Sequence, residues 1–170
     1  LWHRGFPLQL VSKRDAIFLG KTKVECLVQA DFWDGDPDID AFCRITQNPI
    51  VKFKKFGPFT SNVIAPFNSQ NTFLHRDVIP YYMVIPHIGR MDDIWGAYLL
   101  QKDFESKKPF VVYNQATVYQ ERNPHDLTKD LEGEMIGYRQ SLDFVLNDHN
   151  KILPSESKKC YELYKSLFKS

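Results

Sequence analysis

Two adjacent aspartates, Asp92 and Asp93, stand at the start of an expected helix, directly behind Gly89 and Arg90. Apolar residues follow at helical spacing within 94–100, so one face of this helix can pack while both carboxylates occupy its first turn. The positive end of the helix dipole favours ionised carboxylates there. Such a pair suits a general base, a metal contact or hydrogen bonds to sugar hydroxyls. In the structural alternative, Asp92 is only a helix cap and Asp93 only a member of the first turn.

A second acidic group follows the apolar segment 24–30, which we expect to form a mostly buried strand. Carboxylates directly after a strand of an open α/β sheet lie where such sheets bind ligands. Asp34 and Asp36 form the Asp-x-Asp pattern that many sugar-nucleotide enzymes use to hold a divalent cation. A calcium loop is excluded because the required glycine and glutamate are missing at the sixth and twelfth positions. In the structural alternative, which we expect in either case, Asp36 caps a helix that begins at Pro37, and the acids within 38–40 only decorate that helix.

Polar side chains elsewhere offer further contacts. Asn68 and Asn71 hold donors and acceptors in fixed directions, which suits sugar hydroxyls. The equally weighted alternative is that they satisfy the backbone of a turn. His125 lies in the polar segment 121–126 and is either a metal ligand or general base, or a cap or surface residue near a helix start.

Two tryptophans and one arginine complete the set of candidates. Trp33 and Trp95 each form either a stacking wall for a sugar or part of the core. Arg4, beside Gly5 in an irregular aromatic opening, meets either a phosphate or only solvent at a turn.

The elements that would position these residues indicate an α/β chain that ends in two helices. The first of the two helices follows residue 126, and its apolar residues recur every three or four positions, so they form a core stripe. This stripe consists of Leu127, Leu131, Met135, Tyr138, Leu142 and Val145. The second helix opens at Pro154, and its apolar face consists of Cys160, Leu163, Tyr164, Leu167 and Phe168. The other expected elements are strands over 62–65, 71–74, 110–113 and 116–119, an exposed strand or hairpin arm within 48–57, a helical turn over 77–82 and a turn over 107–109.

Composition narrows the classes of partner. The 22 Lys and Arg residues nearly balance the 21 Asp and Glu residues, and the net charge of +1 gives no reason to expect a nucleic acid or an acidic membrane as partner. The three cysteines are odd in number and widely spaced, which argues against a disulfide framework or a zinc site. No apolar run approaches the roughly 18 residues that a membrane-spanning helix needs. We therefore expect a cytoplasmic protein without a membrane span.

Several short motifs occur in one order that resembles a known family. They are Arg4-Gly5-Phe6-Pro7, Asn71-Thr72-Phe73-Leu74-His75-Arg76-Asp77 and Ile88-Gly89-Arg90-Met91-Asp92-Asp93-Ile94-Trp95. Together they resemble the reversibly glycosylated polypeptides, also called UDP-arabinopyranose mutases. With Asp34-Gly35-Asp36-Pro37-Asp38-Ile39-Asp40-Ala41 and Gln120-Glu121-Arg122-Asn123-Pro124-His125, the series looks closer to the STELLO-type glycosyltransferases.

This resemblance implies a GT-A-like glycosyltransferase fold, an α/β fold with a mixed sheet and flanking helices. It also implies a nucleotide-sugar donor such as a UDP-sugar, a divalent cation (Mg or Mn), and no organic cofactor. In the mutases the arginine of the Arg-Gly motif becomes glycosylated, which would fall on Arg4. The paired acids would fall on Asp92 and Asp93, beside the donor sugar or the acceptor hydroxyl. The resemblance leaves Golgi association open.

The chain begins at Leu1, and the nucleotide-binding half of that family lies upstream of its Arg-Gly motif. We therefore expect residues 1–170 to form one domain that is a fragment of a larger GT-A-like domain, its C-terminal, acceptor-side part. Residues 1–125 would form the family-like core and residues 126–170 the C-terminal helices. No residue is assigned as a metal ligand.

The first functional expectation is a glycosyltransferase or sugar mutase whose partners are a nucleotide sugar and a glycan or protein acceptor. Asp92 or Asp93 would be its catalytic residue. The alternative is a non-catalytic module that retains the fold and binds a glycan or a protein.

Overall fold

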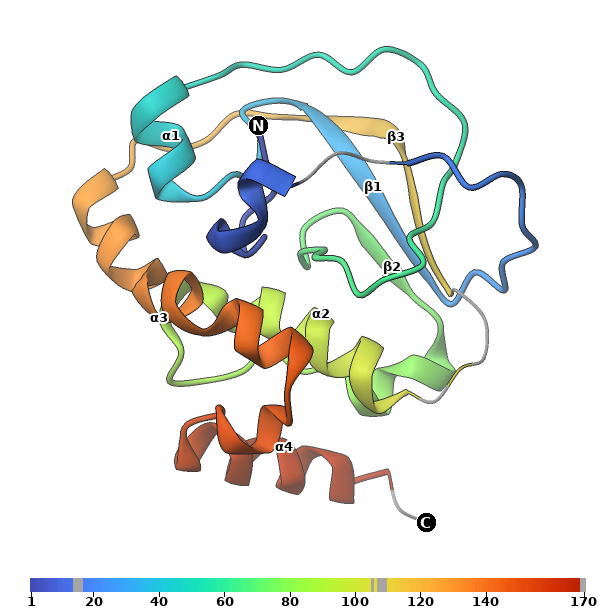
Figure 1. Ribbon diagram of the computed structural model, residues 1–170, viewed down its shortest axis with the longest axis vertical. Helices are drawn as coiled ribbons and strands as arrows, with labels where there is room; N and C mark the ends of the chain where they lie inside the picture. Colours follow the sequence, from blue (N-terminus) through green and yellow to red (C-terminus); the bar gives the residue numbers. More distant parts are fainter. Residues whose placement is uncertain (14–16, 105, 107–109, 169–170) are drawn as a thin grey trace.

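A computed structural model describes residues 1–13, 17–104, 106 and 110–168, and over these residues the chain is α/β (Figure 1). Short 3₁₀ helices are labelled η. The elements in chain order are η1 (Leu8–Lys13), β1 (Val28–Gly35), α1 (Ala41–Gln47), β2 (Thr72–Leu74), η2 (Arg76–Tyr81), η3 (Gly89–Met91), α2 (Asp92–Asp103), β3 (Val111–Gln120), α3 (Leu127–Leu146), η4 (His149–Lys151) and α4 (Ser155–Ser166). No helix among the described residues is long and apolar enough to cross a membrane.

The described strands form one small mixed sheet in the order β2-β1-β3. β1 is central because it pairs antiparallel with β2 and parallel with β3, and Val28 pairs with both Leu74 and Val111. A parallel pair needs a crossover connection. Here the crossover contains α1 and α2, so β1, β3 and these two helices come from one continuous stretch of chain (Figure 1).

The strands differ from the expected ones at their ends. β1 begins four residues later than expected and continues to Gly35, so the first acids of the second acidic group lie within the strand and not after it. The two strands expected over 110–113 and 116–119 form a single strand, β3, whose pairing with β1 shifts register between Asp31 and Trp33. No strand forms over 62–65. The turn expected over 107–109 lies outside the described residues.

The segment 48–57 is irregular, with one bridge between Val51 and Gly35, so the expected strand or hairpin arm is wrong. Its shape comes from aromatic stacking. The ring of Phe53 stacks on Phe32 at 4.9 Å between centroids, and Phe56 meets the same ring at 5.9 Å. Burial of aromatic surface therefore holds this segment where ladder hydrogen bonds are few.

α2 is buried on all sides, since every residue from Asp93 to Leu100 is buried. Ala97 and Leu100 pack in the cluster formed with the sheet, and Trp95 packs in the cluster formed with α3 and α4. The expected one-sided packing of this helix is therefore wrong. A helix enclosed by a sheet on one side and by helices on the other is apolar all round.

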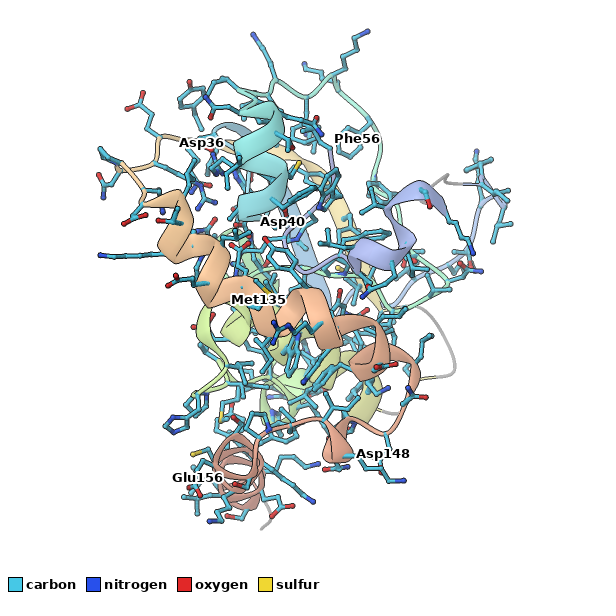
Figure 2. All side chains as sticks on the ribbon, turned by 60° about the vertical axis from the view of Figure 1, so that its left-hand side comes forward. Asp36, Asp40, Phe56, Met135, Asp148 and Glu156 are labelled. Carbon is cyan, nitrogen blue, oxygen red and sulfur yellow. The ribbon has the colours of Figure 1, made fainter. Side chains whose placement is uncertain are left out.

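α3 and α4 pack through faces that differ from the expected stripes. On α3 the buried residues are Glu134, Gly137, Ser141 and Phe144, and the expected stripe lies partly buried beside them, with Met135 labelled in Figure 2. The reason is close approach, because a Cβ on Gly137 would lie 2.5 Å from the sulfur of Met91. On α4 the buried residues are Ser157 and Tyr161, and the expected apolar residues Leu163 and Leu167 are 67% and 73% exposed.

Candidate functional site

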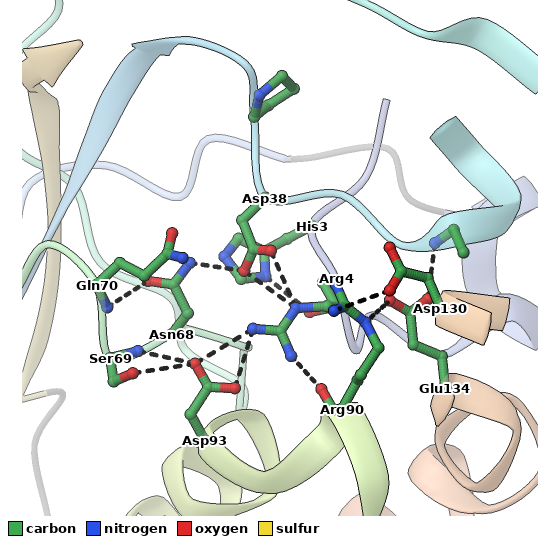
Figure 3. Close-up of polar contacts among 12 residues, drawn as sticks. His3, Arg4, Asp38, Asn68, Ser69, Gln70, Arg90, Asp93, Asp130 and Glu134 are labelled. Atoms are coloured by element: carbon green, nitrogen blue, oxygen red, sulfur yellow. Dashed lines mark hydrogen bonds and ion pairs between the residues drawn. The ribbon is translucent and has the colours of Figure 1, made fainter. Parts of the chain in front are cut away.

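The candidate site centres on Arg4, which is only 7% exposed. Its Nε donates to both carboxylate oxygens of Asp38 at 3.0 and 3.2 Å, and its Nη2 donates to both oxygens of Asp93 at 3.0 and 3.2 Å. Its Nη1 donates to the backbone carbonyl of Arg90. The guanidinium thus joins the N-terminal segment, the loop before α1 and the first turn of α2 (Figure 3).

Both carboxylates have further donors. Asn68 Nδ2 donates to Asp38 at 2.7 Å, and Arg122 Nη2 donates to the same carboxylate at 3.1 Å. The backbone N–H and the hydroxyl of Ser69 donate to Asp93 at 3.1 and 3.2 Å. Buried charges are tolerated when they are paired and hydrogen-bonded, and both carboxylates of this network meet that condition.

The network sets the protonation states of its members. Burial alone would raise the pKa of Asp38, but the charge of Arg4 holds that pKa well below its usual value. Burial likewise opposes the charge of Arg4, but Asp38 and Asp93 together raise the pKa of the guanidinium. The contact between Arg4 and Asp38 is therefore an ion pair, and it joins segments that are far apart in the sequence.

A second series of charged side chains runs from Arg90 toward α3. Arg90 Nε donates to Glu134 at 3.1 Å, and its Nη1 lies 3.1 Å from Asp130. The other oxygen of Asp130 lies 3.0 Å from His125 Nδ1. Glu134 also accepts from the backbone N–H of Ala41 at 2.7 Å, at the start of α1, where the helix dipole favours a carboxylate. These contacts fix the side chain of Arg90 and orient the ring of His125.

Residues of both networks line a cavity of about 580 Å³. Its size falls in the range of about 300–1,000 Å³ that is typical of small-molecule sites. The charges that line it nearly cancel. The lining cations are Arg4, Arg90 and Arg122, and the lining carboxylates are Asp38, Asp92, Asp93 and Glu121. His125 and Gln70 also line it. A ligand must therefore be recognised by directed hydrogen bonds more than by net attraction.

The two aspartates of α2 differ in their surroundings. Asp93 is 5% exposed and bound to Arg4 and Ser69. Asp92 is partly buried and lines the cavity, and it has no ion pair among the described residues. One oxygen of Asp92 accepts the backbone N–H of Asp93 at 2.9 Å. The structural alternative is therefore wrong for both residues, because Met91 occupies the cap position and Asp93 holds a buried arginine.

A smaller cavity of about 280 Å³ adjoins the first and shares Gln70, Gln120 and Glu121 with it. Trp33 and Asn71 line this second cavity. The Nδ2 of Asn71 donates to the carbonyl of Phe32 at 3.0 Å, so it satisfies the backbone of β1 and not that of a turn. Asn68 does satisfy turn backbone, as the alternative expectation held, because its Oδ1 accepts from the N–H of Gln70 at 3.1 Å.

Other sequence candidates lie outside both cavities. Trp95 is fully buried, stacks on Phe144 at 4.3 Å and donates to Ser141, so its expected stacking role toward a sugar is wrong. Asn68 is 2% exposed and bound to Asp38, so it is a buried support and no sugar contact. Gly5 provides a turn with φ of 84° that packs closely against Ile94, and it lines neither cavity.

The Asp-x-Asp pattern does not fit a metal site. Asp34 accepts the backbone N–H of Phe53 at 2.8 Å, while Asp36 pairs with Arg44 and lies 3.8 Å from Arg122. Asp36 does not cap a helix either, because α1 begins after Asp40, whose carboxylate accepts from Cys43. Figure 2 shows Asp36 and Asp40 at the end of the molecule that carries α1. Within the described ranges no group of three His, Cys, Asp or Glu residues could hold a metal ion.

Several site residues were not among the sequence candidates. Asp38 and Arg122 bind each other across the cavity wall, and Glu134 is fully buried beneath it. Asp38 belongs to the acidic group that the sequence does mark, and Arg122 to the polar segment before His125. Glu134 lies beside the expected apolar stripe of α3 and does not interrupt it, so the sequence gives no signal that this carboxylate is buried.

The chain matches no protein-family model, and a search of curated proteins finds no relative. The site must therefore be interpreted from its own geometry.

Proposed function

We propose that the larger cavity is the transfer site of a glycosyltransferase that uses a nucleotide-sugar donor, and that the chain is the acceptor-side part of a GT-A-like fold. The observation that carries the proposal is the position of Asp92. Its carboxylate lies on a cavity that three arginines also line, and it is paired with none of them among the described residues. A carboxylate of this kind is available to take a proton.

In the proposed reaction, the oxygen of an acceptor hydroxyl forms a bond to the anomeric carbon of the donor sugar. The bond from that carbon to the leaving phosphate breaks, and Asp92 takes the hydroxyl proton as general base. Arg90 and Arg122 donate hydrogen bonds to the phosphate, on which negative charge develops. Asp93 and Asp130 are positioning residues, because they hold Arg4 and Arg90 in place.

The resemblance also implies a divalent cation. The Asp-x-Asp pair does not fit such a site, because Asp34 accepts from Phe53 and Asp36 pairs with Arg44. We assign no step to a metal ion.

The test uses the full chain with a panel of UDP-glucose, UDP-galactose, UDP-xylose and UDP-arabinopyranose, with simple glycosides as acceptors and UDP release as the readout. Asp92→Asn should lower the rate about 10²–10⁴-fold, which is the usual contribution of a general base. Its urea unfolding midpoint should stay near that of the unchanged protein, because Asp92 has no ion pair with any residue that the structure describes. The matched control is Asp77→Asn, an exposed carboxylate on η2 whose loss should change neither quantity.

Full activity of Asp92→Asn would remove the assigned base. Glycan binding without turnover of any donor would favour the second class of function, a non-catalytic module that keeps the fold. That class is consistent with the Arg4 network, because a buried ion-pair network can serve the fold alone.

A further inference from the structure

One residue that lines the second cavity, Trp33, has a buried donor that no described residue satisfies. Trp33 lines this cavity and is only 6% exposed, and its indole Nε1 has no hydrogen-bond partner among the described residues. The other two indoles do have partners, since Trp2 donates to Asp40 and Trp95 donates to Ser141. An unsatisfied buried donor destabilises a fold, so each one needs an explanation, and a bound ligand is one such explanation.

The same cavity has an exposed aromatic face. Tyr119 lines it and is 65% exposed. Its ring lies over Gly35, where an added Cβ would come within 3.0 Å of the ring carbon Cζ. Gly35 also has a φ of 95°, so both backbone and space favour glycine there. The glycine thus leaves room for the tyrosine ring beside the cavity.

The lining is chemically complementary to a neutral, hydroxyl-rich ligand. Gln70, Asn71 and Gln120 supply amide groups, which can donate and accept. Glu121 is the one charged residue among the described lining residues, and a carboxylate accepts from hydroxyls while it repels phosphate. The volume of about 280 Å³ is at the lower end of ligand cavities and suits a single ring better than a nucleotide.

We propose that the second cavity binds one uncharged pyranose ring of a glycan, with Trp33 Nε1 donating to a ring hydroxyl and Tyr119 packed against the ring. The two cavities share Gln70, Gln120 and Glu121, so a sugar bound here lies next to the group bound in the larger cavity. In the proposed transferase this position is that of the acceptor sugar, and only that assignment rests on the proposed function. Sugar binding itself does not.

The test is a ¹H–¹⁵N NMR titration of the full chain with methyl glycosides of glucose, galactose, mannose, xylose and arabinose. The protein has three tryptophans, so it gives three indole N–H signals, which are assigned through their own backbone amides without any variant. At least one glycoside should shift the Trp33 indole signal downfield, as expected for a donor that gains an acceptor. The signals of Trp2 and Trp95 should stay in place, because their indoles already have partners.

Two variants provide a second measurement. Tyr119→Ala should weaken binding of the same glycoside several-fold, since it removes the aromatic face. Trp33→Phe should weaken it about two- to tenfold, the loss of one neutral hydrogen bond. The matched control is Phe168→Ala, which removes an aromatic ring that is 44% exposed beyond the end of α4 and should leave binding unchanged.

The proposal is overturned if no glycoside moves the Trp33 signal at tens of millimolar, or if all three indole signals move together. It is also overturned if uridine moves the Trp33 signal and the glycosides do not, because the cavity would then be a base site. Glycoside binding without turnover of any UDP-sugar would support this proposal and count against the transferase. Turnover of a UDP-sugar with an unmoved Trp33 signal would support the transferase and overturn the proposed sugar site.

Discussion

Arg4 and Asp93 are 89 positions apart in the sequence and meet through two hydrogen bonds of 3.0 and 3.2 Å from Nη2. Arg4 is 7% exposed and Asp93 5%. The contact fixes the irregular N-terminal segment against the first turn of α2, and the cavity wall depends on it. It also explains why two adjacent aspartates have different surroundings. Arg4 pairs with Asp93, whereas Asp92 lines the cavity without an ion pair among the described residues.

Replacing Arg4 with methionine should destabilise the fold strongly. The change leaves Asp38 and Asp93 without their shared cation, and breaking a buried ion pair on one side costs about 3–5 kcal/mol. Urea unfolding followed by circular dichroism should show a lower midpoint with a nearly unchanged slope. The matched control is Arg76→Met, because the Arg76 side chain is 88% exposed and a surface ion pair contributes about 0–1 kcal/mol. Equal midpoints for the two variants would mean that the Arg4 network does not stabilise the fold.

Stability should fall as the pH drops below 7, and His3 should cause part of this fall. Burial lowers the pKa of His3, although the nearby Asp38 carboxylate acts in the opposite direction. The unfolded chain binds a proton near pH 6.5 and the folded chain only at lower pH. The unfolded state therefore holds more protons in this window, so the free energy of unfolding decreases as the pH falls through it. The slope from one histidine is at most about 1.4 kcal/mol per pH unit.

Urea unfolding at a series of pH values between 5 and 7.5 measures this slope. His3→Gln should reduce it, and part should remain because burial also lowers the pKa of His149. His75→Gln is the matched control, since His75 is exposed. An unchanged slope in His3→Gln would show that His3 titrates alike in both states.

The order of the elements could be predicted from the sequence better than their packing faces. Local patterns indicate the helices after Asp126 and Pro154, because caps and spacing are local signals. They do not indicate that α3 packs through Gly137 and Ser141, because that choice depends on how closely Met91 approaches. Tertiary contacts decide which face of a helix is buried, and a periodic pattern alone does not contain that information.

The candidate site likewise divides into features that the sequence shows and contacts that only the folded chain shows. The acidic and basic residue types are visible in the sequence, and Arg4, Arg90, Asp92, Asp93 and His125 do line one cavity. Their pairing is not visible, because it joins segments that are far apart in the chain. The sequence therefore could not tell that Arg4 takes Asp93, or that Arg44 and Arg122 lie beside Asp36 and leave no metal site at the Asp-x-Asp pattern.

Adding one methyl group at Gly5 should destabilise the fold by more than about 1 kcal/mol. Gly5 has a φ of 84°, which side chains disfavour, and its new Cβ would lie 2.2 Å from Cγ2 of Ile94 on α2. Gly57→Ala is the matched control, because a Cβ there meets nothing within 4 Å. Thermal unfolding should show a lower midpoint for Gly5→Ala only. Similar midpoints would show that the N-terminal turn can move away from α2 without cost.

Arg4 should not acquire a covalent sugar, in contrast to the expectation that the mutase resemblance implies. A nitrogen needs a lone pair to attack an anomeric carbon, and the carboxylates of Asp38 and Asp93 outweigh burial and raise the pKa of the guanidinium, which keeps it protonated. Each of its three nitrogens also donates a hydrogen bond to a protein oxygen. Intact-mass spectrometry after incubation with UDP-arabinopyranose and UDP-glucose should therefore show the unmodified mass. A pentose or hexose increment that peptide mapping places on Arg4 would contradict this, and it would require that the arginine leave both carboxylates during the reaction.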